Sequence, residues 1–286
     1  MTKSDRNLQD LAWCLSSASL ISPGEESWKE PAWFNSVSLP SEIEEPSKSS
    51  YKLGIRFEDI ICNWIEATPD LELLSRNLPV HDGERTIGEF DLLVQHADQI
   101  EHWELAVKFY LGLNDQRQIN NWFGPDPRDT LAAKFDRVRD HQLKLSEHPA
   151  AQSLLNENGW EINQTRAFMR GRLFYPYNAF CHGEFDYPRE VNENHEKGWW
   201  ITDTRFALQE DMKDGLFTIL EKPFWLALIT SDLKRVVLSH SEIVRHLSRE
   251  HNGSTLHIAR LDSDLNETSR GFVVRSRWVS ACGQEK

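Results

Sequence analysis

The chain has 286 residues, of which 39% are apolar, including 11 Trp and 14 Phe. This is enough for one large domain or two small ones with a sizeable core, so extensive disorder is not expected. The net charge of −13 argues against a protein that coats nucleic acid nonspecifically, although a protein with a local basic groove stays open.

The sequence also sets expectations for the compartment. No apolar run approaches the roughly 18 residues that a membrane span needs, and the N-terminus does not resemble a signal peptide. The four cysteines lie far apart and form no CxxC pair, which argues against a zinc ribbon. Without an export signal, we expect reduced thiols and a cytoplasmic protein that does not enter a membrane.

The predicted elements begin with a short helix within residues 1–20, followed by a linker over residues 22–50 that is rich in Pro, Ser and Glu. The helical spacing of the apolar residues from Leu53 to Trp64 predicts a helix over residues 52–67. The apolar runs that follow predict strands separated by the turn HDGE.

After Gly112 a polar connection leads to a helix that is predicted to start at Asp126 and to run to about Ser146. The second half predicts strands in TRAFMRGRLFYPYN, KGWWITD, FWLALIT, TLHIARLD and RGFVVRSRWV, and a short helix in HSEIVRHLSRE. This order of elements favours an α/β or α+β fold.

The stretch GEFDLLVQHADQIEHWELAVKFYLG, residues 88–112, places charge on apolar strands. Strand side chains alternate between the two faces of a sheet. One predicted face carries the apolar residues Phe90, Leu92, Val94, Trp103, Leu105, Val107 and Phe109. If the two strands pair with their apolar faces together, Asp91, Glu104 and Lys108 fall on the opposite face.

Two interpretations of this charged face stay open. It is either the solvated face of an amphipathic sheet or, because helices flank the strands in the sequence, a covered face with its charges in a cleft. Clustered carboxylates raise one another's pKa unless a cation neutralises them. A bound Mg²⁺ would supply that charge through carboxylate oxygens.

The pattern of an acid, a second acidic strand with a lysine, and a preceding helix with a glutamate resembles the PD-(D/E)XK nuclease superfamily over about residues 50–146. The stretches LGIRFEDIICNW, RTIGEFDLLV, HWELAVKFYLG and HQLKLS resemble more closely an uncharacterised bacterial family, domain of unknown function 1853, over roughly residues 7–280. The resemblance implies an α/β fold with a restriction-endonuclease-like core, a mixed central sheet flanked by helices.

With this resemblance, the chain is expected to divide into three parts. Residues 1–50 would form an N-terminal helix and linker, and residues 51–146 the nuclease-like core. Residues 147–286 would form an α+β portion that packs on the core.

The resemblance also implies roles for five residues. Asp91 and Glu104 would bind Mg²⁺ or Mn²⁺, and Glu58 would complete the metal shell or hold a metal-bound water. Lys108 would orient or deprotonate the attacking water, and Gln142 would lie near the site. The implied activity is metal-assisted hydrolysis of phosphodiester bonds in DNA or RNA.

One departure from the superfamily pattern keeps an alternative function open. The second acid usually stands two residues before the lysine, where this chain has Ala106. Glu104 lies one pleat further, ~6.6 Å along the strand. The alternative is a noncatalytic nuclease-fold module that binds nucleic acid or a protein partner. For Glu58 the alternative to a site role is an acid on the helix surface, and for Gln142 it is a structural amide.

Arg166, Arg170 and Arg172 alternate with aromatic residues in the strand TRAFMRGRLFYPYN. Such a mixture could grip a nucleic-acid strand through phosphate contacts and stacking. An ordinary strand with a charged outer face is the favoured interpretation.

Overall fold

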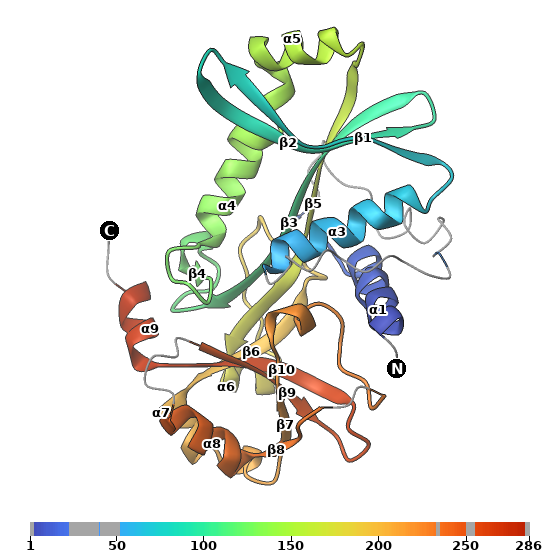
Figure 1. The fold of residues 1–286 in the computed structure, drawn as a ribbon. Coiled ribbons are helices and arrows are strands. Elements are labelled where there is room, and N and C mark those ends of the chain that lie inside the picture. Colours follow the sequence, from blue (N-terminus) through green and yellow to red (C-terminus); the bar gives the residue numbers. More distant parts are fainter. Residues whose placement is uncertain (1–2, 23–39, 41–51, 233–234, 250–254, 284–286) are drawn as a thin grey trace.

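The computed structural model describes residues 3–22, 40, 52–232, 235–249 and 255–283. These residues contain a ten-stranded mixed sheet with the order β1-β2-β3-β5-β6-β10-β9-β7-β8, in which β4 pairs with β3 beside this path (Figure 1). The strands are β1 (Leu71–Asp82), β2 (Arg85–His96), β3 (Gln99–Gly112), β4 (Trp122–Phe123), β5 (Ile162–Pro176), β6 (Glu196–Thr202), β7 (Leu216–Ile219), β8 (Leu238–Ser239), β9 (Thr255–Leu261) and β10 (Glu267–Val274).

Helices pack on this sheet along its length. The α-helices are α1 (Lys3–Ser16), α3 (Leu53–Glu66), α4 (Leu131–Arg137), α5 (Pro149–Glu157), α6 (Tyr177–His182), α7 (Asp203–Leu208), α8 (His240–Arg249) and α9 (Ser276–Cys282). The shorter turns are the π-helical η2 (Val138–Gln142) and the 3-10 turns η1 (Ile119–Asn121), η3 (Leu145–Glu147), η4 (Glu210–Met212) and η5 (Lys222–Phe224). None of the described helices is long and apolar enough to cross a membrane.

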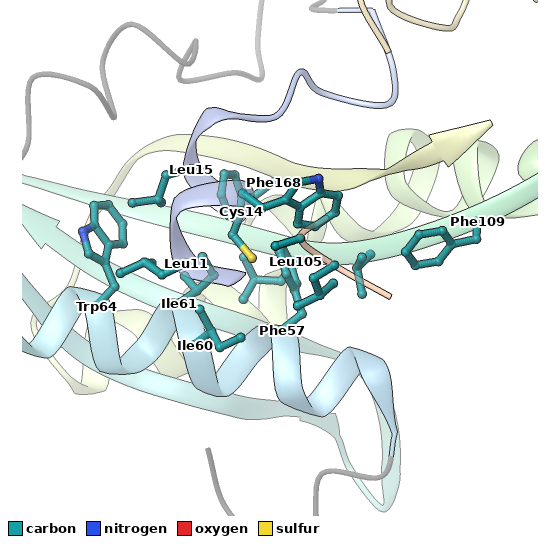
Figure 2. Close-up of a cluster of buried hydrophobic side chains, with 14 of the residues drawn as sticks. Leu11, Cys14, Leu15, Phe57, Ile60, Ile61, Trp64, Leu105, Phe109 and Phe168 are labelled. Carbon is teal, nitrogen blue, oxygen red and sulfur yellow. The ribbon is translucent and has the colours of Figure 1, made fainter. Parts of the chain in front are cut away.

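The helix predicted over residues 52–67 is confirmed as α3. Its apolar stripe, which includes Phe57 and Trp64, is fully buried against α1 and one face of β3 and β5 (Figure 2). Burial of one such side chain stabilises the fold by about 1.5–3 kcal/mol, so this stripe fixes α3 on the sheet. The predicted linker lies outside the described residues except for Ser22 and Pro40.

Strand β3 separates two layers of the structure. Leu105 and Phe109 belong to the core under α3, whereas Tyr110 packs with Leu131 of α4 on the other face. Strand β5 runs parallel to β3 from Ile100 to Leu111, and the connection between the two strands contains α4 and α5. The predicted boundary at residue 146 thus falls in a crossover between neighbouring strands of one sheet.

The helix that was predicted from Asp126 to about Ser146 is shorter and irregular. It begins at Leu131, because the side chain of Thr130 caps it by accepting a hydrogen bond from the Ala133 amide (3.3 Å). The regular α-helix ends at Arg137 and continues as the π-helical turn η2.

The strand predicted in FWLALIT is wrong. The carbonyls of residues 225–228 accept hydrogen bonds from two buried guanidinium groups, those of Arg270 and Arg6. Backbone acceptors that are satisfied by side chains do not need a neighbouring strand. We call Arg6 and Arg270, with their partners Asp10 and Glu267, the arginine cluster.

The charged outer face expected for the strand TRAFMRGRLFYPYN is also wrong. Strand β5 lies between β3 and β6, and both of its faces are covered, so Arg170 and Arg172 are only 0% and 3% exposed. Arg170 donates to the carbonyl of Cys14 (2.8 Å), and Arg172 forms an ion pair with Glu196. These two arginines therefore present no basic surface to solvent.

Candidate active site

Strands β2 and β3 pair over only part of their length. Their ladder runs from His96↔Gln99 to Leu92↔Trp103, although the strands contain 12 and 14 residues. Just past the last pair of the ladder, a side chain replaces the backbone acceptor: Oδ2 of Asp91 accepts a hydrogen bond from the Leu105 amide (2.8 Å). We call this point the β2–β3 fork.

Side-chain alternation breaks at the fork. Phe90 packs with Leu93 in the cluster beneath α5, whereas Leu92 belongs to the core under α3. The predicted placement of Phe90 on the face of Leu92 is therefore wrong. On β1, the residue across from Asp91 is Asn77, which has a φ of 50°. Asn tolerates this left-handed conformation better than most residues, so the β1–β2 ribbon can change faces here.

Glu104 is buried at the fork, with 2% of its surface exposed. Its Oε1 lies 2.8 Å from the His102 Nε2, its Oε2 accepts from the Gln142 amide, and its carboxyl hydrogen-bonds that of Asp91. Ionised carboxylates only accept hydrogen bonds, so a direct bond between two carboxyls requires a proton between them. We call Asp91 and Glu104 the acid pair.

The electrostatics of the acid pair follow from burial. Burial and the neighbouring Glu104 raise the pKa of Asp91 to about 7, and burial raises the pKa of Glu104 to about 7. Burial lowers the pKa of His102 to about 4, so this imidazole is neutral near pH 7, with its Nε2 in hydrogen-bond contact with Glu104. Its Nδ1 has no hydrogen-bond partner within the described structure.

Lys108 does not contact the acid pair. Its Nζ donates to Oδ2 of Asp129 (2.7 Å), and the hydroxyl of Tyr110 donates to the other oxygen of Asp129 (3.3 Å). Asp129 immediately precedes Thr130, the residue that caps α4. The lysine that the resemblance placed in catalysis is therefore paired with a loop carboxylate.

A different lysine lies beside the acid pair. Lys134 of α4 donates from Nζ to Oε1 of Gln142 (2.9 Å), and its positive charge acts to lower the pKa of both Asp91 and Glu104. Burial lowers the pKa of Lys134, and the two acids oppose that shift. The sequence interpretation missed Lys134, and it assigned no role to His102.

Glu58 of α3 reaches the fork from the other side of the sheet. Burial and the charge of Asp91 raise its pKa. Arg76 holds it, since one guanidinium nitrogen lies 3.5 Å from the Glu58 carboxylate and 2.7 Å from that of Asp59. Ala106, which stands where the superfamily carries an acid, packs in the apolar cluster that contains Tyr110.

These contacts limit the way in which the residues could bind a metal ion. The described part of the chain contains no group of three His, Cys, Asp or Glu residues arranged around a metal position. Mg²⁺ commonly uses only one or two carboxylates and fills its other positions with water or phosphate oxygens. The acid pair fits that mode of binding, because a cation could replace the shared proton, whereas a protein cage completed by Glu58 does not fit.

A comparison with known proteins places the chain in a family. Neither curated proteins nor solved structures give a match to it. One family model, described as Domain of unknown function (DUF1853), matches residues 9–274 and so covers α3, the acid pair, Lys134 and β10. The chain belongs to the DUF1853 family.

Proposed function

We propose that this protein hydrolyses phosphodiester bonds of DNA or RNA with Mg²⁺ or Mn²⁺ bound by Asp91 and Glu104. The observation that carries this proposal is the acid pair, in which a buried Glu104 lies beside a half-buried Asp91 and the pKa of each carboxyl is raised to about 7. Two acids side by side with little exposure to water are costly for a fold, and such perturbed groups cluster at functional sites.

The surrounding fold supports the same proposal. Helix α3 precedes three antiparallel strands, the crossover with α4 and α5 follows on the other face, and β5 then lies parallel to β3. A restriction-endonuclease-like core needs a mixed central sheet flanked by helices, and this part of the chain supplies one.

The contacts of the acid pair assign a task to each residue. The Leu105 amide fixes Asp91, and His102 and Gln142 fix the two oxygens of Glu104. A bound divalent ion would polarise a phosphate oxygen and lower the pKa of a bound water. The chain itself holds the two carboxyl groups in place for such an ion.

The test measures cleavage of single-stranded, double-stranded and branched DNA and of RNA, with and without Mg²⁺ or Mn²⁺. We expect cleavage that needs the metal and that is lost in Asp91→Asn and Glu104→Gln. Glu72→Gln, an exposed carboxylate on β1, is the matched control and should cleave normally.

Metal binding gives a second measurement. Metal at ten times its Kd should raise the free energy of unfolding by about 1.4 kcal/mol, and the melting temperature with it. Asp91→Ala should remove this rise. An equal rise in the wild type and in Asp91→Ala would mean a nonspecific ion effect and would count against the proposal.

The second candidate is a noncatalytic nuclease-fold module. It is favoured by Ala106 in the position of the usual acid and by the engagement of Lys108 with Asp129. Such a module would cleave none of these substrates but would bind a nucleic acid or a protein. Binding to nucleic acid would weaken as salt rises, because phosphate contacts release counterions.

A further inference from the structure

The two lysines near the fork differ in what holds them. Lys108 is paired with Asp129, whose side chain is 40% exposed. Lys134 is held by the neutral amide of Gln142, and the other end of the same amide donates to Glu104. Among the described residues, Lys134 therefore has no carboxylate in direct contact, and it faces the acid pair through one bridging side chain.

The turn η2 produces this arrangement. Gln142 follows Lys134 by eight residues, and in a regular α-helix that spacing leaves the two side chains roughly 80° apart. A π-helical turn contains one residue more than an α turn. The Leu143 amide donates to the carbonyl of Val138 (3.0 Å), which closes such a turn, so Gln142 takes the place that an i+7 residue has in an α-helix.

We infer that Lys134, and not Lys108, binds the phosphate that is cleaved beside the acid pair. The inference rests on the proposed function and names its phosphate-binding residue. A lysine ammonium has three hydrogens, and within the described structure Lys134 gives one to Gln142. The remaining hydrogens can be donated to phosphate oxygens while Gln142 keeps the side chain next to Glu104.

The chemistry explains why a cation is needed there. In hydrolysis a water oxygen bonds to phosphorus, and the bond from phosphorus to one ester oxygen breaks. One water proton leaves to solvent, and the other ends on the departing ester oxygen. Negative charge is spread over the phosphate oxygens meanwhile, and a positioned cation stabilises that charge. Lys134 would act there as a direct contact to the substrate.

The experiment compares Lys134→Met with Lys108→Met in the full chain, and Lys144→Met, an exposed lysine after η2, is the control. We expect Lys134→Met to lower kcat by about 10²- to 10³-fold, as the loss of one charge-stabilising donor does. Lys108→Met and Lys144→Met should stay within about threefold of the wild type. Lys134→Arg should restore part of the activity, since it keeps the charge.

Calorimetry of Mn²⁺ binding at pH 8 separates catalysis from support of the acid pair. Lys134→Met should bind Mn²⁺ at least as tightly as the wild type, because a positive charge near two carboxylates is removed. If it loses Mn²⁺ binding together with activity, the lysine only shapes the pair and the inference is overturned.

The activity data separate the two proposals. If Lys108→Met is inactive and Lys134→Met is active, the inference fails while the proposed function stands. If the wild type cleaves no substrate with metal present, the proposed function fails and this inference fails with it.

Discussion

The β2–β3 fork and the arginine cluster both bury charge in the same sheet, but they balance it differently. In the arginine cluster, Arg270 donates to both oxygens of Glu267 and to three backbone carbonyls, and the arginine and the glutamate are 1% and 0% exposed. At the fork, two acids face each other, and Lys134 is separated from Glu104 by the amide of Gln142.

The difference indicates what each region does. A buried ion pair whose hydrogen bonds are all used fixes the chain, and here it replaces a strand ladder over residues 225–228. The acid pair also links neighbouring elements, through the Leu105 amide and Gln142, but within the described residues its nearby cation, Lys134, reaches it only through the Gln142 amide. The arginine cluster therefore has a structural role, whereas the fork is the place where the proposed metal would bind.

The largest expected effect is a loss of stability, and it tests the comparison between the two regions directly. Glu267→Gln should destabilise the protein by about 3–5 kcal/mol, because it leaves Arg270 buried without its counter-charge. Glu104→Gln should cost far less or should stabilise at pH 8, since it removes one of two repelling acids. Urea denaturation of both variants measures the contrast. Equal losses would show that the fork is as structural as the arginine cluster.

A smaller effect concerns pH. Folding raises the pKa of both acids from about 4 to about 7, so the folded state binds more protons and its stability falls as pH rises through that window. The acid pair should contribute a loss on the order of 1–3 kcal/mol between pH 6 and 8. The difference in unfolding free energy between the wild type and Asp91→Asn/Glu104→Gln, followed against pH, isolates it. A flat difference would contradict the proposed pairing.

The smallest effect is expected at Lys108. Its ion pair with Asp129 is 28% and 40% exposed, and such pairs contribute about 0–1 kcal/mol. A double-mutant cycle with Lys108→Met and Asp129→Asn should give a coupling below about 1 kcal/mol that shrinks at high salt. A coupling of several kcal/mol would show that Lys108 has a structural role like that of the arginine cluster.

Periodicity predicted the elements whose side chains pack regularly. The 3.6-residue spacing gives α3 to within one residue at each end. It failed in FWLALIT, because a ladder of side-chain donors from Arg6 and Arg270, remote in sequence, cannot be read from local hydrophobicity.

The candidate site shows the same limit. The alternation of strand side chains predicted Asp91 and Glu104 on the same face. The break in alternation displaces Phe90, whereas Asp91 and Glu104 lie next to the last paired residues of the ladder, where the alternation still holds. Lys134 could not be predicted, since an eight-residue spacing to Gln142 aligns only after the extra residue of η2.

The hydrogen bond from the Leu105 amide to Asp91 makes one backbone position a spectroscopic reporter. The proton chemical shift of an amide depends strongly on the charge of its acceptor, so the Leu105 signal would move when Asp91 loses its proton or gains a cation. Trp103 is paired with Leu92 in the regular ladder, so its amide signal offers an internal reference on the same strand. A single ¹⁵N-labelled sample could thus follow occupancy of the fork in the absence of any substrate or turnover.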